Sequence, residues 1–290
     1  MPRTAKTPRP RHGRRKLPRF SQRLSLQGGL SVSPFCFGMT TDWRLIPAAF
    51  EMGINFFFIS TDLHWPLYEP NRKGLRSLLA SRRGIRDEVA VAGVTYLAQP
   101  EFYSGPLSEL VDAVPGLRRL DLLVAGGVYG PDLLARARML RNLVAAFSAR
   151  SIGASFHDRD TAVTAANHGL VDLCYVRYNP GHTGARVDLF PRLTAPRAPV
   201  FNFKSGHGFV PHARLRELKV DSKLWYPDPP DYYRYALSRP QVDGLLFSVR
   251  SDRELAELEA ALGRGGLTSD EETHLEQLAV ITGKVDDRQR

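Results

Sequence analysis

The chain has 290 residues, 43% of them hydrophobic and 24% charged, with a formal net charge of +10. These values fit one large globular domain or two small ones, each with a sizeable apolar core. No apolar run approaches the roughly 20 residues of a membrane helix, and no apolar segment follows the basic N-terminus. We therefore expect no membrane span, no secretory signal and a cytoplasmic location.

The excess positive charge lies at the N-terminus. Residues 1–23 contain nine Lys or Arg, the first acidic residue is Asp42, and the remaining residues hold 31 basic against 30 acidic side chains. Four prolines fall among the first 18 residues, so we predict that residues 1–20 form a disordered basic tail. We interpret this tail as a solubilising extension or a start-site artefact, with contact to nucleic acid or an acidic surface as the alternative.

Short apolar runs alternate with helical patterns along the rest of the chain, which favours βα units around a parallel sheet. The predicted strands are residues 35–39, 55–60, 89–95, 121–125, 151–155, 173–177, 199–203 and 244–248. Helices are predicted at 132–149, 231–237 and 252–262, and from Thr268, whose spacing to Glu271 fits a capping box. Residues 181–197 are predicted to be loop. Eight strands with intervening helices indicate a (β/α)8 barrel.

The cysteines, Cys36 and Cys174, both lie within predicted strands. We expect them to be buried reduced thiols rather than a disulfide framework. The histidines His207 and His212 are five residues apart, and neither a paired acid nor a cysteine accompanies them. This spacing does not suit one helix face, so we do not predict a metal site.

Five motifs occur in the order of one known family. They are Gly29–Ser33 with Phe37-Gly38, Gly53–Ser60, Arg150–Ser155, Tyr178–Pro180, and Val242–Ser251 with Leu255. Together they resemble the aldo-keto reductases over nearly the whole chain after residue 20. The resemblance implies a (β/α)8 barrel of the aldo-keto reductase type over residues 21–285, with a short C-terminal tail at 286–290. It also implies an NADP(H) cofactor and a small carbonyl substrate.

The catalytic tetrad of that family is not kept. Its Asp, Tyr, Lys and His positions correspond here to Phe58, Leu63, Val94 and Gly126. In the family the Asp and Lys form a buried ion pair. Losing one partner would strand a buried charge, whereas replacing both with apolar residues is often neutral or stabilising. We therefore expect Phe58 and Val94 to be a matched replacement, buried close together.

Other polar side chains follow the predicted strands, where barrel enzymes place their chemistry. Asp62 could orient His64 and raise its pKa, which would make His64 a general acid; the alternative is a partly packed loop. Lys204 stands where many family members carry Ser and could replace the lost cation or grip a phosphate. His157 follows the fifth strand and could face the pocket.

The residues aligned with the family's cofactor-binding site resemble the family more closely than the residues aligned with its catalytic tetrad do. The residues that the resemblance assigns to the cofactor are Ser155, Ser248, Arg250, Ser251 and Glu257. The last four belong to the loop and helix that hold a phosphate of the cofactor, where backbone N–H groups and a guanidinium suit an anion. Phe156, Tyr175 and Leu258 depart from the pattern.

Three functions are compatible with these features. The preferred one is a diverged NADP(H)-binding oxidoreductase that uses another proton donor, with His64 as the first candidate. The alternative is an inactive barrel that serves as a binding or assembly scaffold. A third is a non-redox enzyme that uses Asp62, His64, His157 and Lys204.

Overall fold

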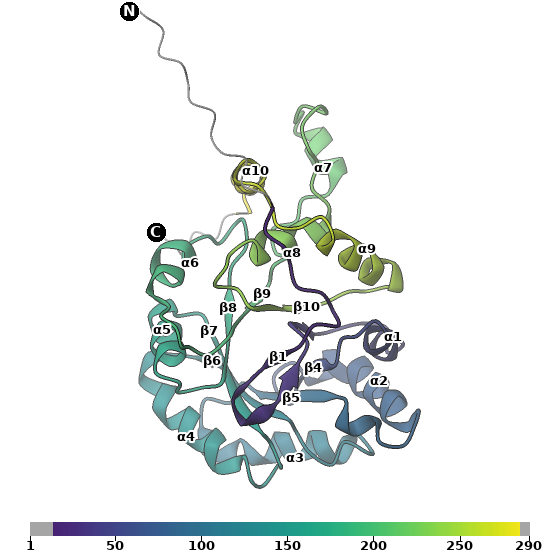
Figure 1. Cartoon of the computed structure of the whole chain (residues 1–290), viewed down its shortest axis with the longest axis vertical. Helices are drawn as coiled ribbons and strands as arrows, with labels where there is room; N and C mark the ends of the chain where they lie inside the picture. The colour runs from purple at the N-terminus through teal and green to yellow at the C-terminus, as the bar shows by residue number, and fades with distance from the viewer. Residues whose placement is uncertain (1–13, 285–290) are drawn as a thin grey trace, which may run out of the picture.

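The computed structural model describes residues 14–284, which form a closed barrel of parallel strands surrounded by helices (Figure 1). The barrel strands are β3 (Phe35–Phe37), β4 (Phe56–Ser60), β5 (Ala90–Thr95), β6 (Leu122–Val128), β7 (Ser151–Phe156), β8 (Leu173–Arg177), β9 (Val200–Phe203) and β10 (Gly244–Phe247). The strands pair in this order and β10 closes onto β3. The predicted (β/α)8 architecture is confirmed, and each predicted strand overlaps an observed one.

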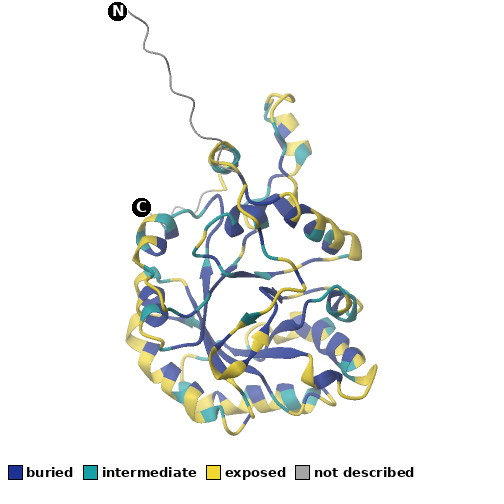
Figure 2. Ribbon diagram, viewed as in Figure 1, coloured by how far each residue is buried: buried dark blue, intermediate teal, exposed yellow. Residues whose placement is uncertain are grey.

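Helices cover the outside of the barrel, as their buried inner faces and exposed outer faces show (Figure 2). The helices in chain order are α1 (Leu45–Glu51), α2 (Glu69–Ala80), α3 (Ser104–Ala113), α4 (Leu133–Leu143), α5 (Arg159–Asn167), α6 (Ala185–Asp188), α7 (His212–Glu217), α8 (Pro229–Leu237), α9 (Asp252–Leu262) and α10 (Ser269–Ile281). Of these, α7 projects away from the barrel (Figure 1). The predicted capping box of α10 is present. The Thr268 side chain accepts a hydrogen bond from the Glu271 N–H, and the Glu271 side chain accepts one from the Thr268 N–H. Between residues 14 and 284, no helix is long and apolar enough to cross a membrane.

Residues 181–197 are not entirely loop, contrary to the sequence-based prediction. They contain α6 and a 3-10 turn over Phe190–Arg192. Arg159 of α5 reaches across to Asp188 of α6 with N–O distances of 2.6 and 3.0 Å. The segment was misread because its Pro, Gly and Arg content hid two helical turns too short to show periodicity.

Large aromatic side chains fill the barrel interior. Phe56 on β4 lies 6.0 Å from Phe201 on β9, and Phe58 lies 5.6 Å from Tyr175 on β8, measured between ring centroids. These strands are not neighbours in the closed sheet, so their side chains meet only through the interior. The hydroxyl of Tyr175 contacts the Cys36 thiol at 3.6 Å. The interior is therefore packed and is not a pore.

Both cysteines are buried and unbridged, as expected. Burial raises the pKa of the Cys174 thiol to about 12 and raises that of Cys36 further still. Neither thiol is therefore ionised near neutral pH. Because thiolate is the reactive form of cysteine, these residues are packing groups rather than nucleophiles.

The N-terminal segment corrects the predicted boundary of the tail. Residues 1–13 and 285–290 lie outside the described residues, but residues 14–20 pack on the barrel. Leu17 is 2% exposed, and the fully buried Phe20 ring lies 4.9 Å from Phe35 on β3. Arg14 forms a bidentate ion pair with Glu271 at 2.6 Å. Residues 14–20 therefore pack on the barrel through Leu17, Phe20 and the Arg14 ion pair, although the composition of this segment is basic.

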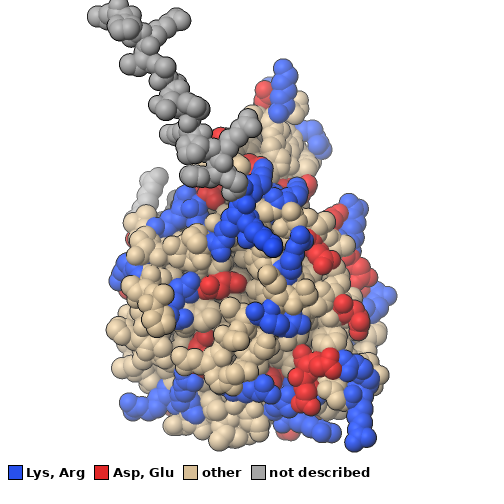
Figure 3. All heavy atoms as spheres, in the orientation of Figure 1, with Lys and Arg blue, Asp and Glu red and all other residues tan. Residues whose placement is uncertain are grey.

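Charge on the body of the protein is mixed. On the face shown in Figure 3, Lys and Arg are interspersed with Asp and Glu, which agrees with the near balance of charges after residue 23. Many of these charges are paired, among them Arg197 with Asp243 at 2.7 Å and Arg141 with Asp172 at 2.6 Å. A basic surface that would attract nucleic acid is therefore not a general property of the barrel.

Candidate functional site

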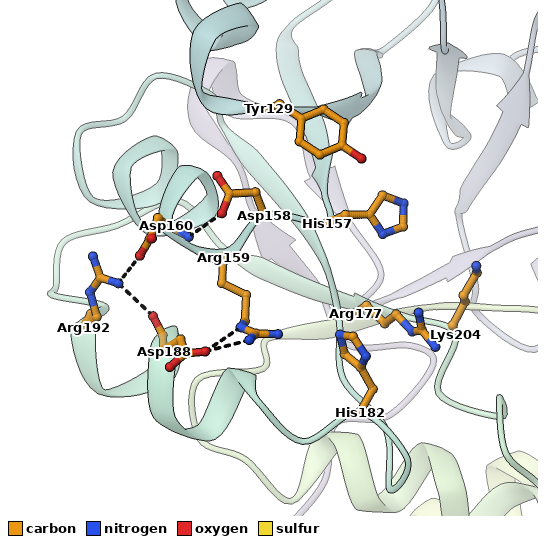
Figure 4. A pocket seen from close by; sticks show the side chains of 10 residues that line it. All are labelled: Tyr129, His157, Asp158, Arg159, Asp160, Arg177, His182, Asp188, Arg192 and Lys204. Carbon is orange, nitrogen blue, oxygen red and sulfur yellow. Dashed lines mark hydrogen bonds and ion pairs between the residues drawn. The ribbon is translucent and has the colours of Figure 1, made fainter. Parts of the chain in front are cut away.

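A large cleft lies at the C-terminal ends of the strands, the end of such barrels where ligands bind. It has a volume of about 640 Å³ and is drawn in Figure 4. Its side chains come from the ends of β6, β7, β8 and β9 and from the α5 and α6 region. They are Tyr129, His157, Asp158, Arg159, Asp160, Arg177, His182, Asp188, Arg192 and Lys204. We call this the cationic cleft, because four Arg or Lys side chains face three carboxylates.

All three carboxylates of the cationic cleft have local partners. Asp158 caps α5 by accepting hydrogen bonds from the backbone N–H groups of Asp160 and Thr161. Asp160 is ion-paired with Arg192, and Asp188 with Arg159. These acids therefore neutralise Arg159 and Arg192 and stabilise the α5–α6 contact.

Three further basic side chains of the cleft come from the ends of three adjacent strands. His157 follows β7, Arg177 ends β8 and Lys204 follows β9. Partial burial and the nearby charges of Lys204 and Arg177 lower the pKa of His157 below its usual value of about 6.5. His157 is thus neutral at pH 7, and the potential around it is positive. Lys204 and His157, predicted separately, are brought together by the structure.

Two smaller clefts continue from Lys204 along the rim. One, of about 220 Å³, lies among Gly38, Tyr68, Phe203, Lys204 and Ser248. The other, of about 290 Å³, includes Tyr233, Ser248, Arg250, Glu254 and Glu257. Lys204 lines both the first of these and the cationic cleft, and Ser248 lines both smaller clefts, so the three lie next to one another in an arc over β7 to β10 and the start of α9.

The two positions that the resemblance aligned with the Asp–Lys pair, Phe58 and Val94, lie on neighbouring strands. Phe58 and Val94 are 2% and 0% exposed. They lie on the neighbouring strands β4 and β5, and Val94 is in register with Ser60, two residues after Phe58. The two side chains therefore share the interior face. The Tyr68 ring covers Phe58 at 6.2 Å, so an aromatic cluster occupies this position.

The other two positions that the resemblance aligned with the tetrad, Leu63 and Gly126, hold no proton donor. Leu63 is 70% exposed and lies on the surface of the loop after β4. Gly126 lies against the Tyr96 ring, and a Cβ atom built there would meet that ring at 2.3 Å. Tyr96 therefore takes the space in which a histidine at position 126 would begin.

This packing gives a prediction for Gly126→Ala. We expect it to destabilise the fold by about 1–3 kcal/mol, because the added methyl group would overlap a partly buried ring. Chemical denaturation measures the change. Gly105→Ala in α3 is the matched control: no atom lies within 4 Å of the added group, so it should be neutral or stabilising by up to about 1 kcal/mol. Equal stabilities for the two variants would contradict the packing.

Asp62 does not orient His64, contrary to the sequence-based hypothesis. Among the described residues, its carboxylate accepts from Thr95 Oγ1 at 2.5 Å, from the Tyr96 N–H at 2.9 Å and from the Leu63 N–H at 2.6 Å. It ties the loop after β4 to the end of β5. His64 is exposed, and its ring lies edge-on to Tyr96 at 5.4 Å. His64 thus lies over β4 and β5, whereas His157 lies over β7.

Ser155, one of the predicted cofactor ligands, holds the backbone of the neighbouring strand. Its hydroxyl accepts a hydrogen bond from the Gly127 N–H at 2.9 Å, where the pairing of β6 and β7 shifts register. Its exposed fraction is only 9%. Tyr175, at the usual Gln position, is fully buried and contacts Cys36.

The remaining cofactor candidates surround the start of α9. Ser248 and Arg250 are exposed and line the 290 Å³ cleft, and Ser251 caps the helix through the Glu254 N–H. Glu254 in turn accepts from the Arg250 N–H at 2.8 Å. Glu257 also lines the cleft and binds Arg253 Nε at 2.7 Å.

Sequence reasoning missed Arg177, His182 and Tyr129. Arg177 carried the clearest signal, because it is the only charged residue of the apolar strand β8 and stands at its C-terminal end. His182 and Tyr129 carried none, since only barrel closure brings their loops to the cleft.

His212 lies against the Pro227 carbonyl at 3.2 Å and Asp228 at 3.3 Å. Within residues 14–284, no group of three or more potential metal ligands is found.

Comparison with known proteins adds no assignment, because no family model and no curated protein matches this chain.

Proposed function

We propose that this chain is a diverged barrel of the aldo-keto reductase type that binds NADP(H) along the arc of clefts over β9, β10 and α9. The observation that carries the proposal is the position of Arg250. The family-like run Ser248–Ser251 lies on a cleft that continues to Lys204 and the cationic cleft. A cofactor phosphate at one end and a substrate at the other would then share one continuous surface.

The residues at the phosphate end fit such a cofactor. The Arg250 guanidinium is exposed at the cleft, where it can form paired hydrogen bonds to a phosphate. Because Glu254 already occupies the Arg250 N–H, the side chain rather than the backbone would make this contact. At the other end, Ser155 keeps a hydroxyl hydrogen to donate. Bound NADP(H) would supply a hydride to a carbonyl carbon.

The chain's own contribution to reduction would be a proton and the positioning of the carbonyl. Because the tetrad is absent, the proton must come from another group on the rim. His64 and His157 are the candidates, and they lie over different strands. The lowered pKa of His157 disfavours its protonated form, the form that would donate a proton, whereas His64 is exposed at the loop after β4. We therefore keep His64 as the proposed donor.

A second candidate function is a binding scaffold without turnover. The aromatic cluster of Phe58, Tyr68 and Tyr175 favours it, because these rings fill the interior beside the lost tetrad. The two functions differ in one result. A scaffold binds NADPH or another ligand but reduces no carbonyl compound in a broad aldehyde and ketone panel, whereas the oxidoreductase reduces at least one of them. His64→Ala should then slow that reduction by at least about a hundredfold while NADPH binding is kept.

Arg250→Ala should weaken NADPH binding by about 1.5–3 kcal/mol, roughly ten- to a hundredfold, because a charge-assisted contact to the 2′-phosphate is lost. NADH lacks this phosphate, so its affinity should change little. Calorimetric titration measures both affinities. The control is Arg253→Ala on the same helix, an exposed residue paired with Glu257. Equal losses for the two cofactors would remove Arg250 from a 2′-phosphate site.

A further inference from the structure

The cleft of about 220 Å³ combines apolar side chains with a hydroxyl and an ammonium group. Met39, Phe203 and Leu246 supply apolar surface, while Tyr68 reaches the cleft from the segment before α2 and Lys204 from the end of β9. Drug-sized ligands occupy clefts of about 300–1,000 Å³, so this cleft suits a smaller molecule. Its lining fits a compact apolar body that carries one polar group.

The Tyr68 side chain is buried, but its hydroxyl lacks an acceptor. The residue is 9% exposed and its ring packs on Phe58, yet no side chain or backbone group in the described part of the chain hydrogen-bonds to the hydroxyl. Burial, with smaller effects of Tyr96 and Cys36, raises the pKa of Tyr68, so the hydroxyl keeps its proton at neutral pH. A buried donor without an acceptor is costly, and a ligand oxygen in the cleft would remove that cost.

Lys204 brings a positive charge to the same cleft from an unusual backbone conformation. Its φ is 57°, in the left-handed region that glycine or asparagine adopts more readily than lysine. Over residues 14–284 its ammonium group forms neither a hydrogen bond nor an ion pair. Figure 4 shows Lys204 at the opposite edge of the cationic cleft from Asp160 and Asp188. Strained residues occur mostly at ligand sites, and here the strained residue carries a charge.

Two buried asparagines hold the backbone around this cleft. Asn71 of α2 donates from Nδ2 to the Gly38 carbonyl at 2.6 Å, which fixes the end of β3 beside the cleft. Asn179 donates from Nδ2 to the Lys204 carbonyl at 3.0 Å, which supports the left-handed conformation there. The cleft is therefore formed before a ligand enters, which lowers the cost of binding one.

We propose that this cleft binds a small monocarboxylate with a compact apolar body, whose carboxylate accepts a hydrogen bond from the Tyr68 hydroxyl and pairs with the Lys204 ammonium group. One neutral donor and one cation suit a single negative charge shared by two oxygens. Met39, Phe203 and Leu246 would contact the apolar body. This inference goes beyond the proposed function, because binding of the acid requires neither NADP(H) nor turnover.

The first test is fluorine NMR titration of the full-length protein, without nucleotide, with para-fluorobenzoate and separately with the neutral para-fluorobenzamide. We expect para-fluorobenzoate to bind saturably, with a dissociation constant in the millimolar range or below. The amide should bind at least about tenfold more weakly, because it lacks the charge that would pair with Lys204. Absence of saturable para-fluorobenzoate binding, or equal affinities for the two compounds, would overturn the proposal whatever the result with NADPH.

Two variants assign the contacts. Tyr68→Phe removes the hydroxyl and keeps the ring, and Lys204→Met removes the charge and keeps most of the side-chain length. Each should weaken para-fluorobenzoate binding at least about tenfold. Lys223→Met, at an exposed lysine near α7, is the control and should leave the affinity unchanged. Unchanged affinity in Tyr68→Phe or in Lys204→Met would contradict the proposal, because the acid would then lie elsewhere.

Lys204→Gly separates binding from stability. It removes the charge and relieves the left-handed conformation, so the variant should melt no earlier than the unmodified protein while para-fluorobenzoate binding falls at least about tenfold. Differential scanning calorimetry measures the melting temperature. Loss of binding in a protein that is at least as stable cannot come from unfolding, whereas full affinity in Lys204→Gly would show that the ammonium group takes no part in the site.

Discussion

Replacing Phe58 by Asp is expected to lower the free energy of unfolding by at least about 4 kcal/mol. The ring is 2% exposed and contacts Tyr68 and Tyr175, and loss of such a ring alone costs about 3–5 kcal/mol. The new carboxylate would be buried with no cation at position 94 to pair with it, which adds to the cost. Urea unfolding followed by circular dichroism measures the change, and Phe58→Asp should not raise carbonyl reduction above the wild-type level.

Val94→Lys in the Phe58→Asp background should recover part of this loss, because both side chains face the interior from neighbouring strands. A double-mutant cycle with the two single variants gives the coupling free energy, which we expect to be favourable. Phe58→Leu is the control that keeps an apolar side chain, and it should cost only about 1–2 kcal/mol. A stable Phe58→Asp protein would show that position 58 is not enclosed.

Deleting residues 1–20 is expected to lower the melting temperature by roughly 10 °C, because the buried side chains of Leu17 and Phe20 are lost. The ion pair of Arg14 with Glu271 is lost with them. Deleting residues 1–13 instead removes none of the described contacts, so it should change the melting temperature by no more than about 1 °C. Differential scanning calorimetry of both truncations measures these values.

Phe20→Ala in the full-length chain separates packing from chain length. It should reproduce a large part of the loss caused by the longer truncation, since the Phe20 ring packs on Phe35 and Phe247. Equal melting temperatures for the two truncations would mean that residues 14–20 do not stabilise the barrel. Any retention on heparin that depends on residues 1–13 should disappear with either deletion and should be sensitive to salt in the intact protein.

The barrel was predictable from the sequence because its signals are local. Each strand is a short apolar run bounded by turn residues. The spacing of Thr268 and Glu271 indicates the capping box of α10. The burial of Phe58 and Val94 was also predictable, since both are apolar residues within predicted strands. The boundary of the N-terminal tail was not predictable. The basic, proline-rich composition of residues 1–20 indicated disorder, although the segment contains the apolar residues Leu17 and Phe20.

The candidate site was less predictable, because its contacts depend on which loops meet. Lys204 and His157 were selected for standing after strands, but nothing local shows that Arg177 lies beside them. Asp62 was paired with His64 by proximity in sequence, whereas the fold gives its carboxylate to Thr95 and Tyr96 of the next strand. Side-chain contacts between residues of different strands depend on how the barrel closes, and the spacing of residues in the sequence does not predict them.

The most direct test of the proposed function is calorimetric titration of the full-length protein with NADPH. We expect one saturable site per chain with a dissociation constant in the micromolar range or below, and clear weakening by Arg250→Ala. Absence of binding up to millimolar NADPH, in a protein shown to be folded by circular dichroism, would contradict the assignment of the rim over β9, β10 and α9 to NADP(H).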